Sequence, residues 1–264
     1  MTKNQHYIPK FYQKYWECER KGYLWALDKK HNNIRQVAIT NNCSAEYLYE
    51  ADINEPTNIF ENYYKTEIED KYAGEYLSLV NSRNVHSRIS ASDKAMVCKL
   101  FANFSARNSI NLYNNPTNNF IASHFIMDTI NIERGRRYIQ NVMPFSNDLF
   151  ESKLRSYSIQ ILTSDKSDIV FCDSLIEQVH YPDEYFFPIC PYMTACFSLT
   201  DKGRDGLIRK ITTDEYDRII KLYAVDQRVG KIFAKDKSVL ENIKRQYHFI
   251  HRTYKIPFDC EFAD

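Results

Sequence analysis

The chain is poor in residues that break helices, and it has no long apolar run. Its 264 residues include 6 Gly and 8 Pro, which is few for a protein with many tight turns and predicts long helices. No stretch approaches the ~20 apolar residues that span a bilayer. Residues 1–16 also lack the continuous apolar segment of a signal peptide. We therefore expect a cytoplasmic protein with no membrane partner.

The cysteines are too scattered for a disulfide framework or a zinc ribbon. There are 7 of them, an odd number, and no two are spaced as Cys-x-x-Cys. We expect them to be reduced and mostly buried. The formal net charge is +1, so the molecule as a whole has no strong field that would draw it to DNA or to an anionic membrane. Any nucleic-acid site must therefore be a local patch.

The common enzyme signatures are missing, whereas aromatic residues are abundant. The sequence contains no GxSxG, no GxxxxGK, no GxGxxG and no HExxH. It has 20 Tyr and 16 Phe. Aromatic side chains bury large areas in protein cores, but they also stack on bases and ligands. We favour core packing as their main use.

The apolar pattern predicts a single elaborated α+β domain that spans residues 1–264. A chain of this length is at the upper end of what one hydrophobic core supports, and no Gly/Ser/Pro-rich linker divides it. Residues 22–40 predict an N-terminal β-hairpin, because two strand-like runs flank a polar turn. Residues 57–141 predict a helix-rich middle. The helices expected there are 57–81, 92–113 and 119–141.

The period of the apolar residues changes after residue 155. Residues 155–200 predict several strands of a later, mainly antiparallel sheet. Pro188 and Pro191 predict an edge strand or a bulge, because proline cannot donate a hydrogen bond to a ladder. Residues 213–250 predict two C-terminal helices, at 213–229 and 237–247.

The run at residues 6–12, His-Tyr-Ile-Pro-Lys-Phe-Tyr, is the most individual stretch of the chain. A histidine beside a fixed proline turn and several aromatic rings is placed to form hydrogen bonds or to bind a metal. The alternative is a structural role, since a lone histidine is more often satisfied within the fold than catalytic. Both interpretations are open at this point.

This run resembles the opening motif, His-Tyr-x-Pro-x-Phe-Tyr, of a largely bacterial uncharacterised family called DUF4238. The likeness covers most of the chain. A hairpin follows as in the family, with Tyr-Leu-Trp-Ala-Leu-Asp-Lys at residues 23–29, and residues 188–191 resemble a later Pro-Leu-Ser-Pro segment. Of the family's Thr-Ser-Asp-Asn-Pro segment the chain keeps only the aspartate. The polar residues that match the family are Glu61, Glu69, Arg107 and Asp173.

These residues predict a divalent-metal site if the fold brings them together. His6, Glu61, Glu69 and Asp173 offer the nitrogen and oxygen atoms that hard or borderline cations bind. We expect His6, Glu69 and Asp173 to be the ligands, and Mg²⁺ or Mn²⁺ to be the metal. Arg107 could clamp a phosphate or carboxylate with its planar guanidinium. It could equally pair with one of the glutamates.

A surface role for the two glutamates is also open. Glu61 and Glu69 are eight residues apart, a little over two helical turns, so they share a helix face with Lys65 between them. A ladder of salt bridges along this face would need no metal.

Two functions follow from these residues. The first is a metal-dependent phosphodiester hydrolase, nuclease-like, in bacterial defence or toxicity, in which Arg107 stabilises the phosphate charge. The second is a non-catalytic module that binds nucleic acid or a partner protein through basic and aromatic residues. For the basic residues, a solvated helix face is the alternative. The candidates for nucleic-acid contacts are Arg134, Arg136, Arg137, Lys244 and Arg245.

Overall fold

The computed structural model of the chain describes residues 4–46, 58–82, 86–107, 150–173, 184–226 and 229–247. Its strands, in chain order, are β1 (Asn4–His6), β2 (Tyr23–Asp28), β3 (Asn33–Ala38), β4 (Ser44–Glu46), β5 (Ser158–Thr163), β6 (Phe171–Cys172), β7 (Glu184–Cys190), β8 (Met193–Ser198), β9 (Ile208–Lys210) and β10 (Lys231–Ala234).

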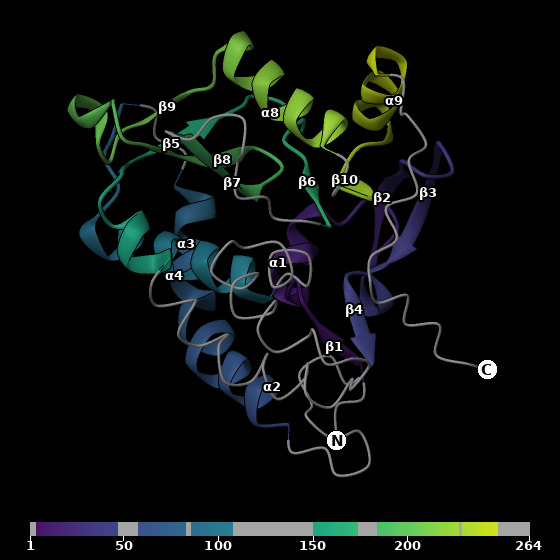
Figure 1. The fold of residues 1–264 in the computed structure, drawn as a ribbon, viewed down its shortest axis with the longest axis horizontal. Helices are drawn as coiled ribbons and strands as arrows, with labels where there is room; N and C mark the ends of the chain where they lie inside the picture. The colour runs from purple at the N-terminus through teal and green to yellow at the C-terminus, as the bar shows by residue number, and fades with distance from the viewer. Residues whose placement is uncertain are drawn as a thin grey trace, which may run out of the picture.

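Most of these strands form two four-stranded sheets. The first sheet has the order β3-β2-β10-β6 and the second the order β7-β8-β5-β9, while β1 and β4 pair separately (Figure 1). Among the described strands, β5 and β9 are parallel and the other pairs are antiparallel. The expected class, α+β with a mainly antiparallel sheet, is therefore confirmed.

Helices cover both faces of the sheets, which gives three layers (Figure 1). One apolar cluster joins the sheets to α1 (Lys10–Gln13), α3 (Lys71–Asn81) and α4 (Ala91–Arg107), and a second joins them to α8 (Thr213–Val225) and α9 (Lys237–Gln246). Successive strand residues point to opposite faces. In β10, for example, Phe233 lies in the first cluster and Ile232 and Ala234 in the second. The six cysteines of the described residues are all buried, as expected.

The N-terminal segment lies inside the first cluster. Ile8, Tyr12, Gln13 and Trp16 are each 0–1% exposed. The Tyr12 ring contacts aromatic rings from α4, β6 and β7, namely Phe104, Phe171 and Phe187. Its hydroxyl donates to the Pro188 carbonyl at 2.7 Å, and the Trp16 indole N–H donates to the Ile169 carbonyl at 3.2 Å. The aromatic residues of this segment thus serve core packing, which the sequence favoured.

The predicted hairpin and the predicted irregularity at Pro188 are both confirmed. β2 and β3 pair from Tyr23 opposite Ala38 to Asp28 opposite Asn33. Pro188 lies in β7, which is an edge strand, and the register of β7 shifts between Pro188 and Cys190. The missing N–H of proline explains both features, because an edge strand or a bulge does not need that donor.

The helix predicted at 57–81 is present, but it is not a uniform α-helix. It consists of α2 (Ile59–Tyr63), a π-helical segment η3 (Tyr64–Asp70) and α3. The next predicted helix is α4, while residues 108–113 and the helix expected at 119–141 lie outside the described residues. None of the helices in the described part of the chain is long and apolar enough to cross a membrane.

The boundaries predicted for the C-terminal helices were wrong in one respect that matters for the fold. The helical stretch predicted to reach residue 229 ends at Val225, and β10 follows it. β10 pairs with both β2 and β6, so the N-terminal hairpin is part of a larger sheet. The four residues of β10, Lys-Ile-Phe-Ala, are too few for periodicity to distinguish a strand from a helix.

Candidate functional site

Arg107 connects two of the residues that the sequence singled out, Glu69 and His6. Its Nη1–H donates to Glu69 Oε1 at 2.9 Å, and its Nη2–H donates to the backbone carbonyl of His6. The guanidinium carbon lies 4.3 Å from the centre of the Tyr64 ring. The side chain is 1% exposed, and a buried charge is stable only when it is paired and hydrogen-bonded. The prediction that Arg107 pairs with one of the glutamates is therefore confirmed.

The π-helical segment η3 determines the direction of Glu69. A π-helix bonds i to i+5 and holds more residues in each turn than an α-helix, so residues on either side of it do not keep α-helical spacing. Glu69 lies in η3 and directs its carboxylate to Arg107, while Glu61 lies half-buried in α2. Among the described residues, Glu69 pairs with Arg107, and no ion pair joins Lys65 to either glutamate. The salt-bridge ladder that was the alternative for these residues is therefore not seen there.

The His6 side chain is buried and neutral at physiological pH. Its Nε2 lies 3.4 Å from the Ile39 carbonyl, and the residue is 4% exposed. The pKa of His6 is lowered from 6.5 to about 4, first by burial and then by the positive charges of Lys10 and Arg107. The contact between His6 and Arg107 uses the His6 backbone carbonyl rather than its imidazole ring.

Asp173 lies at the end of β6, where it binds the start of β10. Its Oδ1 accepts the backbone N–H of Gly230 at 3.0 Å, and its own N–H donates to the Lys231 carbonyl at 3.1 Å. A Cβ atom on Gly230 would lie 2.9 Å from Asp173 Oδ2, so a larger residue at this position would displace the Asp173 carboxylate. Burial raises the pKa of Asp173 from 3.8 to about 6, although the N–H and charge of Lys231 oppose that change.

The predicted metal ligands do not form a metal centre in the described part of the chain. No group of three or more His, Cys, Asp or Glu side chains there could hold a metal ion. Glu69 pairs with Arg107, the His6 ring faces the Ile39 carbonyl, and Asp173 binds Gly230. The N-terminal segment does reach the strand before Asp173, because Trp16 packs on Phe171. The packing is aromatic, however, and it does not bring the three ligands together.

The basic residues predicted to bind nucleic acid are only partly described. Lys244 and Arg245 lie in the last turn of α9, where Lys244 Nζ donates to the Asn32 carbonyl at 2.6 Å and Arg245 donates to the Asn242 side chain. Positive charge at this end of a helix is favourable because it offsets the helix dipole. Arg134, Arg136 and Arg137 lie outside the described residues.

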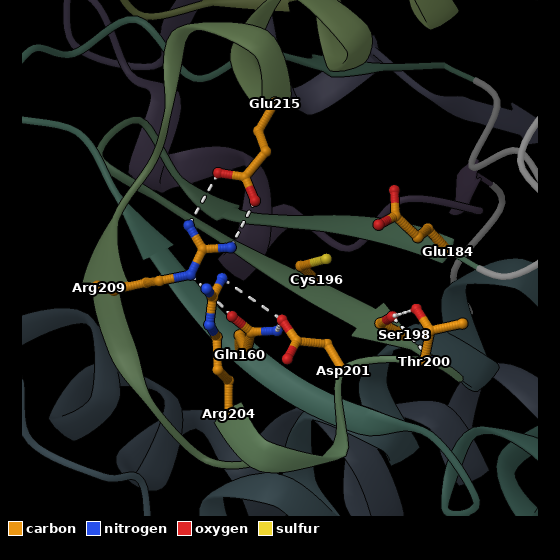
Figure 2. Close-up of a pocket in the computed structure, with 9 residues that line it drawn as sticks. All are labelled: Gln160, Glu184, Cys196, Ser198, Thr200, Asp201, Arg204, Arg209 and Glu215. Carbon is orange, nitrogen blue, oxygen red and sulfur yellow. Dashed lines mark hydrogen bonds and ion pairs between the residues drawn. The ribbon is translucent and has the colours of Figure 1, made fainter.

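A polar pocket of about 330 Å³ opens on the second sheet, on the side that faces α8 (Figure 2). Beneath α8 this face is apolar, since Leu162 and Phe186 pack there. Beyond the helix the same strands present Gln160, Cys196 and Ser198, which form the floor of the pocket. The walls are Glu184 of β7, Thr200, Asp201 and Arg204 after β8, Arg209 of β9 and Glu215 of α8.

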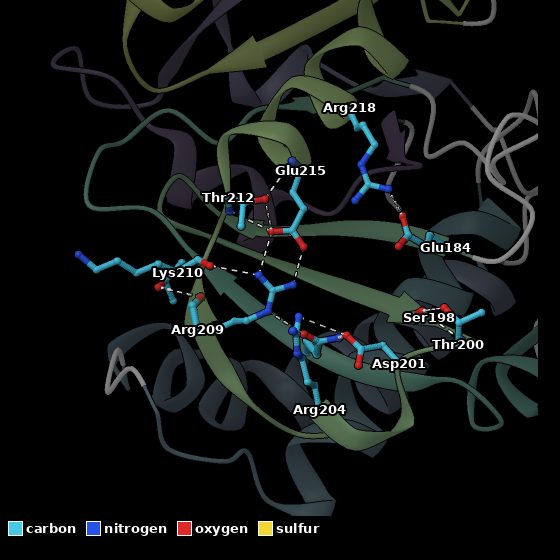
Figure 3. Close-up of polar contacts among 12 residues, drawn as sticks. Glu184, Ser198, Thr200, Asp201, Arg204, Arg209, Lys210, Thr212, Glu215 and Arg218 are labelled. Atoms are coloured by element: carbon cyan, nitrogen blue, oxygen red, sulfur yellow. Dashed lines mark hydrogen bonds and ion pairs between the residues drawn. The ribbon is translucent and has the colours of Figure 1, made fainter.

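A chain of hydrogen bonds fixes one wall of this pocket (Figure 3). Thr212 caps α8, since its hydroxyl accepts the Glu215 N–H and the Glu215 carboxylate accepts the Thr212 N–H at 2.9 Å. Glu215 pairs with both terminal nitrogens of Arg209. Arg209 Nε–H donates to Gln160 Oε1 at 2.7 Å, and Gln160 Nε2–H donates to Asp201 Oδ2 at 3.1 Å. Arg209 and Gln160 are therefore held in defined orientations.

The charge state of the pocket follows from these contacts. Burial raises the pKa of Glu215, but the hydrogen bonds from Arg209 and Thr212 outweigh it and leave the pKa at about 2. Burial raises the pKa of the Cys196 thiol to about 12. At neutral pH the carboxylate is ionised and the thiol is protonated. Because only the thiolate is a good nucleophile, Cys196 contributes volume and a weak hydrogen bond rather than covalent chemistry.

Sequence reasoning missed this pocket, although two local signals pointed to it. In β5, the polar residues Ser158 and Gln160 alternate with Ile159 and Ile161, which predicts one polar face. The spacing of Thr212 and Glu215 is that of a capping box, Thr-x-x-Glu. Neither signal shows that Gln160 and Glu215, which are far apart in the sequence, meet through Arg209.

Comparison with known proteins confirms the resemblance in the N-terminal part of the chain. Residues 4–123 match the model of a family described as Protein of unknown function (DUF4238). The match includes the run at residues 6–12, Glu69 and Arg107. It ends before β5, so the pocket residues and Asp173 lie outside it. No curated protein and no solved structure matches the chain.

His6 and Asp173 should affect stability in opposite directions as the pH changes. The folded-state pKa of His6, about 4, is below its ordinary value of 6.5, so its contribution is present above pH 6.5 and is lost as the pH falls towards 4. The folded-state pKa of Asp173, about 6, is above its ordinary value of 3.8. Its contribution is therefore present below pH 3.8 and is lost as the pH rises through 6.

We expect Asp173→Asn to steepen the loss of stability between pH 6 and pH 4, because it removes the group that opposes His6. His6→Asn should make this loss shallower than in the parent chain, because it removes a group whose pKa is lowered in the fold. Between pH 6 and pH 4, the change in the free energy of unfolding should differ between the two variants by about 1 kcal/mol or more, since one pKa unit corresponds to about 1.4 kcal/mol. Urea unfolding of both variants at several pH values measures this free energy. If the free energy of unfolding changes with pH equally in the two variants, the pKa values of His6 and Asp173 are not shifted as described.

Proposed function

We propose that the chain is a binding protein, and that the pocket on the second sheet holds a small polar ligand. The observation that carries this proposal is a cavity of about 330 Å³ whose floor and walls are formed by polar side chains from four strands, a turn and a helix. Ligand sites are concave and contain a few well-placed polar groups. Their volumes begin at about 300 Å³, so the ligand is small.

The rigidity of the wall supports the proposal. Arg209 is 15% exposed and Glu215 is 12% exposed, and both are held by hydrogen bonds on more than one side. Side chains that are fixed before binding lose little conformational entropy when a ligand arrives. A polar surface used only for solubility would not need such fixed geometry.

The lining also favours a small molecule over a nucleic acid. None of the nine residues that line the pocket is aromatic, whereas single-stranded nucleic acids are commonly bound by stacking of bases on aromatic rings. The pocket walls carry three carboxylates, Glu184, Asp201 and Glu215, against two guanidinium groups, Arg204 and Arg209, so they lack the excess of positive charge that attracts a phosphate backbone. The module expected from the sequence would bind nucleic acid or a partner protein, whereas this pocket suits a small ligand.

Blocking the mouth of the pocket tests this function. Thr200 is an exposed residue of the wall, so Thr200→Trp should fill the opening without disturbing the core. Binding of polar metabolites, screened by native mass spectrometry and quantified by calorimetry, should weaken at least tenfold in this variant. Thr66→Trp, on the exposed side of η3, is the matched control and should bind as the parent chain does. If Thr200→Trp retains full affinity for every ligand found, the pocket is not the site.

A metal-dependent phosphodiester hydrolase, with a role in bacterial defence or toxicity, is the second candidate. The observation that favours it is the meeting of Arg107, Glu69 and the His6 segment. Hydrolysis would further require Mg²⁺ or Mn²⁺ and the carboxylate of Asp173, which in this structure binds Gly230 and would have to approach Glu69. The burial of Arg107 counts against this candidate, because a phosphate would have to replace Glu69 as its partner.

The hydrolase is tested with bis(p-nitrophenyl) phosphate and with plasmid DNA in the presence of Mn²⁺. If the candidate is right, Glu69→Gln and Asp173→Asn should each lower the rate by about 10² or more, and EDTA should abolish it. Lys210→Gln, which changes an exposed ion pair with Asp165, is the control. Activity that survives both carboxylate substitutions would rule out this site.

A further inference from the structure

We propose that the ligand of the pocket is a small zwitterion with an ammonium group and a carboxylate, that is, a free amino acid. This inference rests on the proposed function and names its ligand. Two features of the pocket carry it: Glu184 offers an unused carboxylate oxygen, and Arg204 offers a guanidinium that is only loosely held. These two groups have opposite charges and line the same cavity.

Glu184 is fixed in position but has spare capacity to accept hydrogen bonds. Its Oε2 pairs with Arg218 Nη1 at 2.6 Å, which anchors the carboxylate against α8 (Figure 3). Its side chain is 25% exposed. Within the described residues, Oε1 makes no hydrogen bond, so it can accept an N–H from an ammonium group. Figure 2 shows Glu184 on the opposite side of Cys196 from Arg209 and Glu215, which leaves the space between them for a ligand.

Arg204 provides the complementary positive charge. Its side chain is 56% exposed, and the single ion pair that it makes with described residues, to Asp201, is 3.5 Å long. Such an exposed pair contributes between about 0 and 1 kcal/mol, so a ligand carboxylate can displace it at little cost. A guanidinium binds a carboxylate with two parallel hydrogen bonds. The hydroxyls of Ser198 and Thr200, which lie 3.2 Å apart, can add further bonds.

Two other charged groups of the pocket, Arg209 and Glu215, do not compete for a ligand. Arg209 and Glu215 satisfy one another with two hydrogen bonds. A ligand that broke this half-buried pair would leave a charge without its partner, which is unfavourable. The pair therefore forms a wall, and recognition falls to Glu184 and Arg204.

The balance of charges explains why one ligand should carry both signs. A simple anion at Arg204 would lie close to the Asp201 carboxylate, and a simple cation at Glu184 would lie close to the Arg218 guanidinium. Each would gain one favourable contact and suffer one repulsion. A zwitterion places a charge of the opposite sign at each position, so one ligand gains both favourable contacts. An uncharged polyol would leave both Glu184 and Arg204 without a charged partner.

Calorimetry of the full chain with each of the twenty standard L-amino acids tests the inference. At least one should bind, whereas propionate, ethylammonium and glucose, which share its size but not both charges, should bind at least tenfold more weakly. Glu184→Gln and Arg204→Gln should each weaken binding of that amino acid by about tenfold or more. Arg155→Gln is the control, because Arg155 is 59% exposed and pairs with one carboxylate, as Arg204 does, but it lies outside the pocket.

The possible outcomes separate the inference from the function on which it rests. If propionate or glucose binds as tightly as every amino acid, and Thr200→Trp abolishes that binding, the pocket is a ligand site but the zwitterion is wrong. If amino acids bind and the Glu184→Gln and Arg204→Gln variants do so equally well, the inference is also wrong. Glu184→Gln removes the ion pair between Glu184 and Arg218, and this variant could fail to fold. Because Arg204 is exposed, Arg204→Gln should fold, and it tests the inference by itself.

Discussion

The bulged edge of the second sheet depends on two buried tyrosine hydroxyls. β7 is an edge strand, and its ladder is interrupted between Pro188 and Cys190. A bulge leaves backbone groups without ladder partners, and a buried carbonyl without a partner costs about 1–3 kcal/mol. Tyr12 donates to the Pro188 carbonyl and Tyr76 donates to the Ile189 carbonyl, and both tyrosines are 0% exposed. These hydroxyls allow an edge strand that contains proline to lie inside the core.

This interaction links the N-terminal motif to the pocket. Tyr12 ends the run at residues 6–12 and holds the middle of β7, and the same strand presents Glu184 to the pocket at its start. Arg107 then ties the His6 backbone to η3 through Glu69. The run at residues 6–12 therefore acts by positioning strands rather than by chemistry, which is the structural role that the sequence left open. The match to the family model over residues 4–123 accordingly covers this supporting part and not the pocket.

The features that could be predicted from the sequence are those fixed by local chemistry. Pro188 predicted an edge strand or a bulge, and both occur. This prediction was possible because the missing N–H of proline acts on its own strand. The hairpin and α8 follow from equally local signals. The position of β10 between β2 and β6, the π-helical segment η3 and the meeting of Gln160 with Glu215 depend on contacts between distant residues, which no local pattern specifies. Arg107 was expected to pair with one of the two glutamates without the sequence showing which one, and Arg204 was not predicted at all.

The free energy of unfolding of Tyr12→Phe tests this account most directly. The substitution keeps the aromatic ring and removes only the hydroxyl that binds the Pro188 carbonyl. Tyr63→Phe, at an exposed tyrosine of α2 (39% exposed), is the matched control. The account predicts that Tyr12→Phe lowers the free energy of unfolding by about 1–3 kcal/mol and that Tyr63→Phe changes it by less than about 0.5 kcal/mol. Equal stability of the two variants would contradict the claim that the bulged edge depends on this hydroxyl.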